Sequence, residues 1–356
     1  MTHFDSDYMA GAHPEIIRRI TETNLEETPG YGFDNYTEQA KHAVLNACGL
    51  NPNDSDVFFL VGGTQTNATV IDGLLRTHQG VITIGTGHIN VHEAGAIEAF
   101  GHKVITITGC DGKLMAKDLQ KYLSDFFNDE TWVHMVEPGM VYISYPTELG
   151  TLYSLNELKE IKAVCKEYGL PLYIDGARLG YGLAANGGDL TLNDLATVAD
   201  AFYIGGTKVG ALFGEAVVIP DKTALPRFKT IIKQHGALLA KGRLLGLQFH
   251  TLFSNNLYYS ISEHAIKMAM KLKEGFTQRG SKLYIDSPTN QQFFILENGM
   301  MDKIRKFTSF EVWGNRGEKE TAVRFVTCWA TKESDIDELF ANIDKFSTAS
   351  LVTRLT

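Results

Sequence analysis

Two patterns of apolar residues alternate along most of this chain. Short, continuous apolar runs have the length of a buried strand, and longer amphipathic stretches with helical spacing lie between several of them. The runs that we predict as strands are Val57–Val61, Val81–Ile84, Lys103–Thr108, Trp132–Val136, Val141–Ser144, Pro171–Ile174, Ala201–Ile204 and Glu215–Ile219. Because strands alternate with helices, the pattern indicates an α/β protein with a mostly parallel sheet.

The stretch Leu155–Tyr168 has the clearest helical pattern. Ser154 can cap its first turn, and Glu157, three residues later, completes a capping box. The strand Pro171–Ile174 follows this helix directly and is followed by Asp175. This unit therefore places Asp175 at the carboxyl end of a strand, where open sheets bind ligands.

We expect Glu215–Ile219 to be antiparallel, because it follows Ala201–Ile204 too closely for a crossover helix. Residues near 225–285 predict a long helical region with a break near Phe249–Ser254. Two further strands and a last helix are predicted near Gln292–Leu296, Thr321–Thr327 and Glu333–Lys345. We therefore predict two domains: a large α/β domain at residues 1–248, with an N-terminal arm at residues 1–15, and a small α+β domain at residues 249–356.

Composition and charge narrow the class of protein. The chain has 356 residues, of which 44% are hydrophobic, as expected for an ordered protein. The net charge is −9 and no run of five or more Lys or Arg occurs, so we expect no nucleic-acid partner. We also expect no signal peptide and no membrane span, because the N-terminus is polar and no window of 18 apolar residues occurs.

The four cysteines and the histidines show no spacing typical of a metal site. None of the cysteines forms a CxxC pair, and neither HExxH nor an EF-hand loop is present. We therefore expect no metal, and we expect reduced thiols in a cytoplasmic protein.

Lys208 and Asp175 are the first candidates for covalent chemistry. Lys208 follows a predicted strand and two glycines, and Asp175 follows another predicted strand. A lysine amine can form a Schiff base with an aldehyde cofactor when its neighbours lower its pKa. A carboxylate can hold a pyridine nitrogen protonated, so the pair predicts a pyridoxal 5'-phosphate (PLP) site.

Two strand-to-helix turns offer further ligands. Gly63, Thr64 and Gln65 follow the strand Val57–Val61, and a helix N-terminus after glycines is suited to a phosphate. His88 follows another strand and could stack on a flat ring, with Glu93 orienting a neighbour. Each turn alone is a weak signal, because such turns are common and both histidine and threonine are frequent at surfaces.

Two arginines could hold a substrate carboxylate. Arg178 follows the Asp175 turn, and Arg324 lies within an apolar strand, where a charge needs a partner or a ligand. A structural ion pair or a solvent-facing side chain would also explain Arg324. The sequence at residues 180–185 fits the dinucleotide fingerprint GxGxxA, but it does not directly follow its strand, which argues against an NAD oxidoreductase.

Taken together, these segments resemble the threonine aldolase family of PLP enzymes, within the fold-type-I aminotransferase-like superfamily. The similarity covers nearly the whole chain, at residues 4–7, 30–32, 63–67, 88–93, 175–178, 207–208 and 323–327. It implies a mostly parallel seven-stranded sheet flanked by helices, with a small C-terminal α+β domain. It also implies a homo-oligomer, a dimer or a tetramer built as a dimer of dimers.

The resemblance implies a role for each matching residue. Lys208 would bind PLP covalently, Asp175 would pair with its pyridine nitrogen, and His88 and Ala177 would pack on its two faces. The phosphate ligands would be Gly63, Thr64, Gln65 and Thr207. Arg178 would lie near the cofactor and would bind the substrate carboxylate together with Ser6 and Arg324. Tyr31 would reach the site from a neighbouring subunit, and Lys241 and Arg243 are looser matches for a phosphate contact across the interface.

The chain departs from the family at residues 144–150. Many members carry a histidine in this segment, near the substrate hydroxyl, and here the segment contains none. In this it is more similar to the phenylserine aldolase branch. The departure puts the usual hydroxyl base in doubt, with His88 as the first candidate and Glu148 as the second.

The resemblance implies retro-aldol cleavage of L-3-hydroxy-α-amino acids, such as threonine, allo-threonine or phenylserine, to glycine and an aldehyde. β-Elimination, transamination and folate-dependent hydroxymethyl transfer stay open, because the cofactor performs the difficult step and the pocket selects the bond. A non-enzymatic protein of the same fold is a further alternative, against which Lys208, Asp175 and the two arginines argue.

Overall fold

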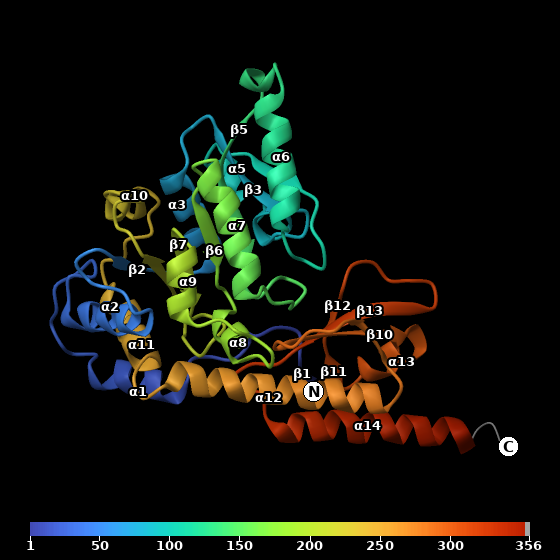
Figure 1. Cartoon of the computed structure of the whole chain (residues 1–356). Coiled ribbons are helices and arrows are strands. Elements are labelled where there is room, and N and C mark those ends of the chain that lie inside the picture. Colours follow the sequence, from blue (N-terminus) through green and yellow to red (C-terminus); the bar gives the residue numbers. More distant parts are fainter. Residues whose placement is uncertain (353–356) are drawn as a thin grey trace.

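The computed structural model describes residues 1–352, and its centre is a seven-stranded sheet (Figure 1). The strand order is β2-β8-β7-β6-β5-β3-β4. The bounds are β2 (Asp56–Leu60), β3 (Gln79–Ile84), β4 (Val104–Ile107), β5 (Glu137–Ser144), β6 (Leu172–Asp175), β7 (Ala201–Gly205) and β8 (Glu215–Ile219). Every pairing in this sheet is parallel except those of β8, which runs antiparallel to β2 and β7. The predicted α/β class, the mostly parallel seven-stranded sheet and the antiparallel strand are confirmed.

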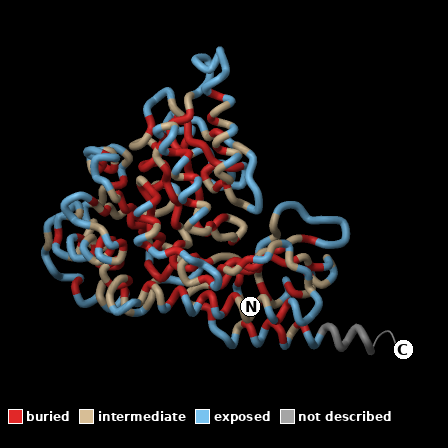
Figure 2. Tube along the Cα trace, in the orientation of Figure 1, coloured by how far each residue is buried: buried red, intermediate tan, exposed pale blue. Residues whose placement is uncertain are grey.

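Helices cover both faces of this sheet. Successive residues of a strand point to opposite faces, and alternate residues such as Val81 and Ile82 accordingly belong to two different core clusters. One cluster includes residues of α2 (Asn35–Ala47), α7 (Leu155–Glu167) and α9 (Leu192–Val198), and the other includes residues of α3 (Gly63–Leu74) and α10 (Phe228–Gln234). Figure 2 shows the buried strands at the centre and exposed positions along the outer helices.

The remaining helices before the C-terminal part include several that add buried residues to the first of these clusters. These remaining helices are α1 (Pro14–Glu22), α4 (His88–Val91), α5 (Ala96–Ala99), α6 (Ala116–Asn128), α8 (Leu179–Ala184), α11 (Arg243–Leu252) and the long α12 (Leu257–Gln278).

The capping box predicted for α7 is present, because Ser154 Oγ accepts from the backbone N–H of Glu157 and the Glu157 carboxylate accepts from the N–H of Ser154.

A second, four-stranded antiparallel sheet has the order β12-β13-β10-β9. Its strands are β9 (Lys282–Ile285), β10 (Gln291–Glu297), β12 (Glu311–Val312) and β13 (Glu320–Val326), and α13 (Asn298–Ile304) and α14 (Glu333–Val352) accompany them. In Figure 1, α14 runs beside α12 below this sheet. The first strand, β1 (Thr2–His3), pairs with β11 (Thr308–Ser309), so the N-terminal segment is attached to the C-terminal part of the chain.

The helical region is interrupted at residues 253–256, between α11 and α12, where Asn255 and Asn256 adopt left-handed backbone conformations. The predicted break at Phe249–Ser254 overlaps this interruption only at its last two residues, because α11 continues to Leu252. A second interruption, at residues 235–242, separates α10 from α11, and β9 occupies the end of the region that we predicted as helical. The predicted boundary at residues 248/249 falls within α11, and the division into two domains stays a prediction. None of the helices within residues 1–352 combines the length and the apolar character that a membrane span requires.

The predicted strand Trp132–Val136 is wrong. Residues Trp132–His134 form a 3₁₀ helix, η1, and β5 begins only at Glu137. The apolar side chains of this run are exposed, with Trp132 39% and Val133 68% accessible. Trp132 instead packs against the rings of Phe126 and Phe127 on α6, so the run covers the end of a helix and does not enter the sheet.

Candidate active site

The candidate catalytic residues lie at one edge of the central sheet. Asp175 ends β6, Lys208 follows β7, and His88 begins α4 after β3. These strands are parallel, so their carboxyl ends meet at the same edge. Glu215 lies there too, because it is the first residue of the antiparallel strand β8 and pairs with Gly205.

Two adjoining cavities open at this edge. The inner cavity, of about 100 Å³, includes among its lining residues Asn67, Asp175, Ala177, Thr207 and Glu215. The outer cavity, of about 700 Å³, includes Ser6, Thr64, Glu311, Trp313 and Arg324. Both cavities share Gly63, His88, Glu148, Arg178 and Lys208. The structure therefore brings together nearly all of the site residues predicted from the sequence.

Asp175 is a buried carboxylate with a full set of donors. Its donors are Asn67 Nδ2 (2.9 Å) and Tyr142 OH (2.7 Å) to Oδ2, and Tyr203 OH (2.6 Å) and the Ala177 N–H (2.9 Å) to Oδ1. Burial alone would raise the pKa of Asp175, but the nearby His88 and these hydrogen bonds outweigh it and lower the pKa below its ordinary value. The group is therefore held as an anion, as a partner for a protonated pyridine nitrogen requires.

His88 is tied to the same network. Its Nδ1 lies 2.7 Å from Oε1 of Glu93, whose side chain is fully buried. The amide nitrogen of Asn67 donates to this same Glu93 oxygen at 2.7 Å as well as to Asp175. One asparagine thus links Asp175, which would pair with the pyridine nitrogen, to the carboxylate that holds His88, and both side chains are fixed in orientation.

Lys208 lies in a turn that its neighbours hold in place. The hydroxyl of Tyr181 donates to the backbone carbonyl of Lys208 at 2.5 Å. Burial is the main cause that lowers the pKa of the Lys208 amine, and the charge of Arg178 lowers it further. The neutral amine is the form that attacks an aldehyde, and a lowered pKa makes this form more abundant.

Glu215 also belongs to this site, although from the sequence we predicted it only as the first residue of a strand. It is 3% exposed and accepts from the Gly206 N–H at 3.0 Å. Burial raises the pKa of Glu215 to about 7, against the opposing effects of Thr207 and the charge of Lys208. The signal that could have identified Glu215 is a carboxyl at the start of an otherwise apolar strand. As with Arg324, a charge in such a strand needs a partner or a ligand.

The N-terminus of α3 has the donors expected of a phosphate site. Its N-cap, Gly62, provides no side-chain cap, so the first N–H groups of this 12-residue helix stay available near Gly63 and Thr64. Thr207 lies across the inner cavity, with its hydroxyl accepting from the Gly214 N–H at 3.0 Å. Gln65 is half-buried, and its Oε1 accepts from the Val61 N–H at 3.4 Å, so the side chain points back along the turn.

Arg178 is held by a partner that the sequence did not indicate. Its Nε and Nη2 donate to Oδ2 and Oδ1 of Asp7, at 2.7 and 3.1 Å. Asp7 is 1% exposed and also accepts from Asn290 Nδ2 at 2.9 Å. Two of the three guanidinium nitrogens thus donate to Asp7, and Nη1 does not.

Arg324 has an ion-pair partner, and one of its guanidinium nitrogens has no hydrogen-bond partner among the described residues. It forms an ion pair with Glu311, donates from Nη1 to Gln291 Oε1 at 2.8 Å, and lies 5.2 Å from the ring centre of Trp313. Its Nε is buried and has no hydrogen-bond partner among the residues described. The structural ion pair considered from the sequence is therefore present. Arg324 also lines the outer cavity, and its role as a substrate ligand stays a prediction.

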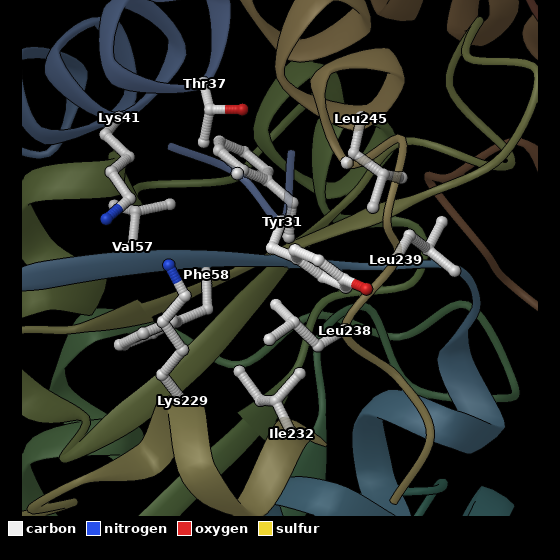
Figure 3. Close-up of a pocket in the computed structure, with 13 residues that line it drawn as sticks. Tyr31, Thr37, Lys41, Val57, Phe58, Lys229, Ile232, Leu238, Leu239 and Leu245 are labelled. Atoms are coloured by element: carbon white, nitrogen blue, oxygen red, sulfur yellow. The ribbon is translucent and has the colours of Figure 1, made fainter. Parts of the chain in front are cut away.

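Tyr31 lies apart from the two cavities. It lines a small apolar pocket with residues of β2, α10 and the following loop, and Figure 3 shows it beside Leu238 and Leu239. Lys233 lies 4.6 Å from the centre of its ring, and Tyr31 is 41% exposed. A single chain does not test whether Tyr31 reaches the site of a neighbouring subunit, so that role stays a prediction.

These residues fit PLP. A buried anion, a lysine with a lowered pKa and an uncapped helix N-terminus are the three groups that a pyridine nitrogen, an aldehyde and a phosphate require. Thr66 Oγ1 and Glu93 Oε2 are also buried without a hydrogen-bond partner inside the described range, beside the same cavity residues. This part of the chain therefore carries polar atoms, one hydroxyl and one carboxylate oxygen, that the described fold leaves without a partner.

Comparison with known proteins shows the family to which the chain belongs. The profile described as "Beta-eliminating lyase" matches residues 3–298. The low specificity L-threonine aldolase of Pseudomonas sp. is 30% identical over 351 residues, covering 96% of each chain. A solved Leishmania major threonine aldolase has a TM-score of 0.93 at 40% identity, covering 97% of this chain and 99% of that one. Serine palmitoyltransferase of Sphingomonas wittichii, at 14% identity, 98% and 88% coverage and a TM-score of 0.72, shares the fold. The chain therefore belongs to the beta-eliminating lyase family, among the threonine aldolases of the fold-type-I PLP superfamily.

Proposed function

We propose that this protein is a PLP-dependent aldolase that cleaves L-3-hydroxy-α-amino acids to glycine and an aldehyde. The observation that carries the proposal is the shared cavity of Lys208 and Asp175, with Arg178 and Arg324 lining the adjoining outer cavity. The named relatives support this reaction class. Phenylserine-type substrates are part of the proposal, because the outer cavity is roomy and carries Phe310 and Trp313 among its lining residues.

When bound, PLP would supply the electron sink for cleavage of the bond between Cα and Cβ. Asp175 would keep its pyridine nitrogen protonated, and His88 and Ala177 would hold the ring between them. The phosphate would be held by the N-terminus of α3 at Gly63, Thr64 and Gln65, together with Thr207. The covalent link would be made by Lys208.

The substrate would be oriented by its carboxylate. Arg324 Nε and Arg178 Nη1 would provide charged donors, and the hydroxyl of Ser6 would provide a third contact in the outer cavity. Fixing the carboxylate orients the bond that breaks, because its direction relative to the ring selects the reaction. The amine of Lys208, once free, would return a proton to Cα.

We also propose a homo-oligomer, a dimer or a tetramer, in which Tyr31 of one subunit completes the site of the next. Tyr31, Phe33 and Leu25 are exposed apolar side chains on one segment, at 41%, 66% and 92%. Arg243 Nη1 is buried and has no hydrogen-bond partner within the described chain, which suits a phosphate contact of Lys241 or Arg243 across an interface. A cytoplasmic location is proposed from the four cysteines, which are free.

The test is product identity with threonine, allo-threonine and phenylserine. The proposal predicts glycine and the matching aldehyde in equal amounts from at least one of them, and none from Lys208→Ala. The family description favours one competing reaction, β-elimination, which would give a keto acid with ammonia. Elimination products in place of an aldehyde would reject the proposal, and amine transfer that depends on an added keto acid would replace it by an aminotransferase.

A further inference from the structure

Retro-aldol cleavage needs a group that removes the proton of the substrate β-hydroxyl. The segment at residues 144–150 contains no histidine, and the ring of His88, whose Nδ1 lies 2.7 Å from Glu93, is predicted to stack on the cofactor. The same segment, however, brings one carboxyl into the site. The inference that follows rests on the proposed aldolase reaction.

The carboxyl of Glu148 is fixed in place by two donors. Its Oε1 accepts from the backbone N–H of His88 at 2.9 Å and from Ser144 Oγ at 2.6 Å. The first donor is an N-terminal N–H of α4, and the second comes from the end of β5, next to Asp175 in the register of the sheet. Because both bonds go to one oxygen, they set the orientation of the carboxyl and do not occupy Oε2.

Glu148 lies where the two cavities join. It lines both of them, as do Lys208 and Arg178, whereas Asp175 and Glu215 line the inner cavity and Glu311 the outer one. A substrate that is joined to the cofactor in the inner cavity and held by its carboxylate in the outer cavity would pass Glu148. Of the carboxyls that line these cavities in the described chain, Glu148 is the one shared by both.

The charges around Glu148 suit a proton acceptor. Burial is the largest influence and raises its pKa, the hydrogen bond from Ser144 opposes this, and the charge of Asp175 raises it further while His88 lowers it. The other charged or titratable groups that interact with it are Arg178, Tyr142 and Tyr153. A carboxylate with a raised pKa is a better base than an ordinary glutamate and still gives the proton up afterwards.

We propose that Glu148 is the general base that takes the proton of the substrate β-hydroxyl. In this step the O–H bond breaks and its proton goes to Glu148, while the electron pair of that bond becomes the second bond of the aldehyde C=O. The Cα–Cβ bond breaks and its pair stays on the Cα fragment, which the bound cofactor stabilises. Cα then receives a proton from the Lys208 amine, which gives glycine, and Glu148 returns its proton to solvent.

His88 has a different task in this scheme. Its side chain is anchored by Glu93 for packing against the cofactor ring, and its backbone N–H positions the base. Ser144 is a second positioning residue, because its hydroxyl donates to the same oxygen.

The experiment compares Glu148→Gln with the wild-type holoenzyme in two reactions. Aldehyde release needs the hydroxyl base, whereas exchange of the glycine α-proton in D₂O, followed by NMR, needs only Lys208 and the cofactor. We expect cleavage by Glu148→Gln to fall roughly 100- to 10,000-fold, the usual contribution of a general base. Glycine exchange should stay within about threefold of wild type, and so should the visible absorbance of bound PLP. Glu160→Gln, an exposed glutamate on α7, is the matched control and should leave both rates unchanged.

The pH profile provides the second readout. The acid limb of kcat/KM should lie above the ordinary glutamate range in the wild type and should disappear in Glu148→Gln, whereas Glu148→Asp should keep a limb at reduced rate. Equal losses of cleavage and exchange, or unchanged cleavage, would overturn the assignment. If the wild type exchanges glycine but releases no aldehyde from any hydroxy-amino acid, the proposed function itself fails and the base falls with it.

Discussion

The carboxylate of Asp7 holds the guanidinium of Arg178 by two hydrogen bonds, from Nε to Oδ2 at 2.7 Å and from Nη2 to Oδ1 at 3.1 Å. The side chain of Asp7 is fully buried and that of Arg178 is 12% exposed. The N-terminal segment thus fixes the direction of an arginine that follows β6. This contact connects the stability of the fold to the geometry of the predicted substrate site.

Replacing Asp7 by Asn should destabilise the fold, because Arg178 would keep a buried charge without its counter-ion. Removing one partner of a buried ion pair typically costs about 3–5 kcal/mol. We expect the free energy of unfolding in urea to fall by an amount in this range. Asp302→Asn, which breaks an exposed pair with Arg316, is the control and should cost less than about 1 kcal/mol. Equal effects of the two substitutions would contradict this account.

The pH dependence of the same pair has a definite sign. Burial raises the pKa of Asp7, but the charge of Arg178 and the hydrogen bonds outweigh it, so the folded-state pKa lies below the ordinary value. The stabilisation is therefore complete above the ordinary aspartate pKa and is lost as pH falls through the depressed one. The difference between wild type and Asp7→Asn should stay constant at neutral pH and shrink only below about pH 4.

Arg324→Ala should raise KM for the amino acid with little effect on cofactor binding. A hydrogen bond to a charged group contributes about 1.5–3 kcal/mol, which corresponds to a rise of roughly tenfold to a hundredfold. Arg324→Lys keeps the charge but loses the planar fork, so we expect an intermediate KM. Steady-state kinetics at saturating PLP would measure both, and an unchanged KM in Arg324→Ala would remove this residue from the substrate site.

Glu215→Gln should weaken the pH dependence of stability between about pH 4.5 and 7. Burial raises the folded-state pKa of Glu215 to about 7, so the folded chain prefers the protonated form. That contribution is present below the ordinary glutamate pKa and is lost as pH rises through 7, which should make the wild type less stable at pH 8 than at pH 5. Urea unfolding of the chain without added cofactor would show it, and parallel pH curves for wild type and variant would contradict it.

The strand and helix pattern was largely predictable because buried parallel strands are continuous apolar runs and their helices carry caps. β6, β7 and α7 show this, and Lys208 and Asp175 follow from the two strands. The run Trp132–Val136 was wrongly predicted as a strand, because a short apolar run has no periodicity that distinguishes a buried strand from a segment packed on a helix. Its exposure depends on the packing of α6, which local sequence does not encode.

The partners of the site residues were not predictable in the same way. Asp7 and Arg178 are 171 positions apart, and Asn67 and Asp175 are 108 apart. Such pairs form only when the strands take their order in the sheet, and no single segment of the sequence determines the order β2-β8-β7-β6-β5-β3-β4. The resemblance to a family supplied the roles of the residues, but the contacts of Glu148, Glu215 and Glu311 came from the fold.

The most direct test of the account is to locate the covalent link. The purified protein would be loaded with PLP, reduced with borohydride, digested and examined by mass spectrometry. We predict a single pyridoxyl adduct on the peptide that carries Lys208, together with loss of the visible absorbance band, and no adduct in Lys208→Ala. An adduct on another lysine, or an unmodified Lys208 in a protein that still cleaves its substrate, would contradict the account.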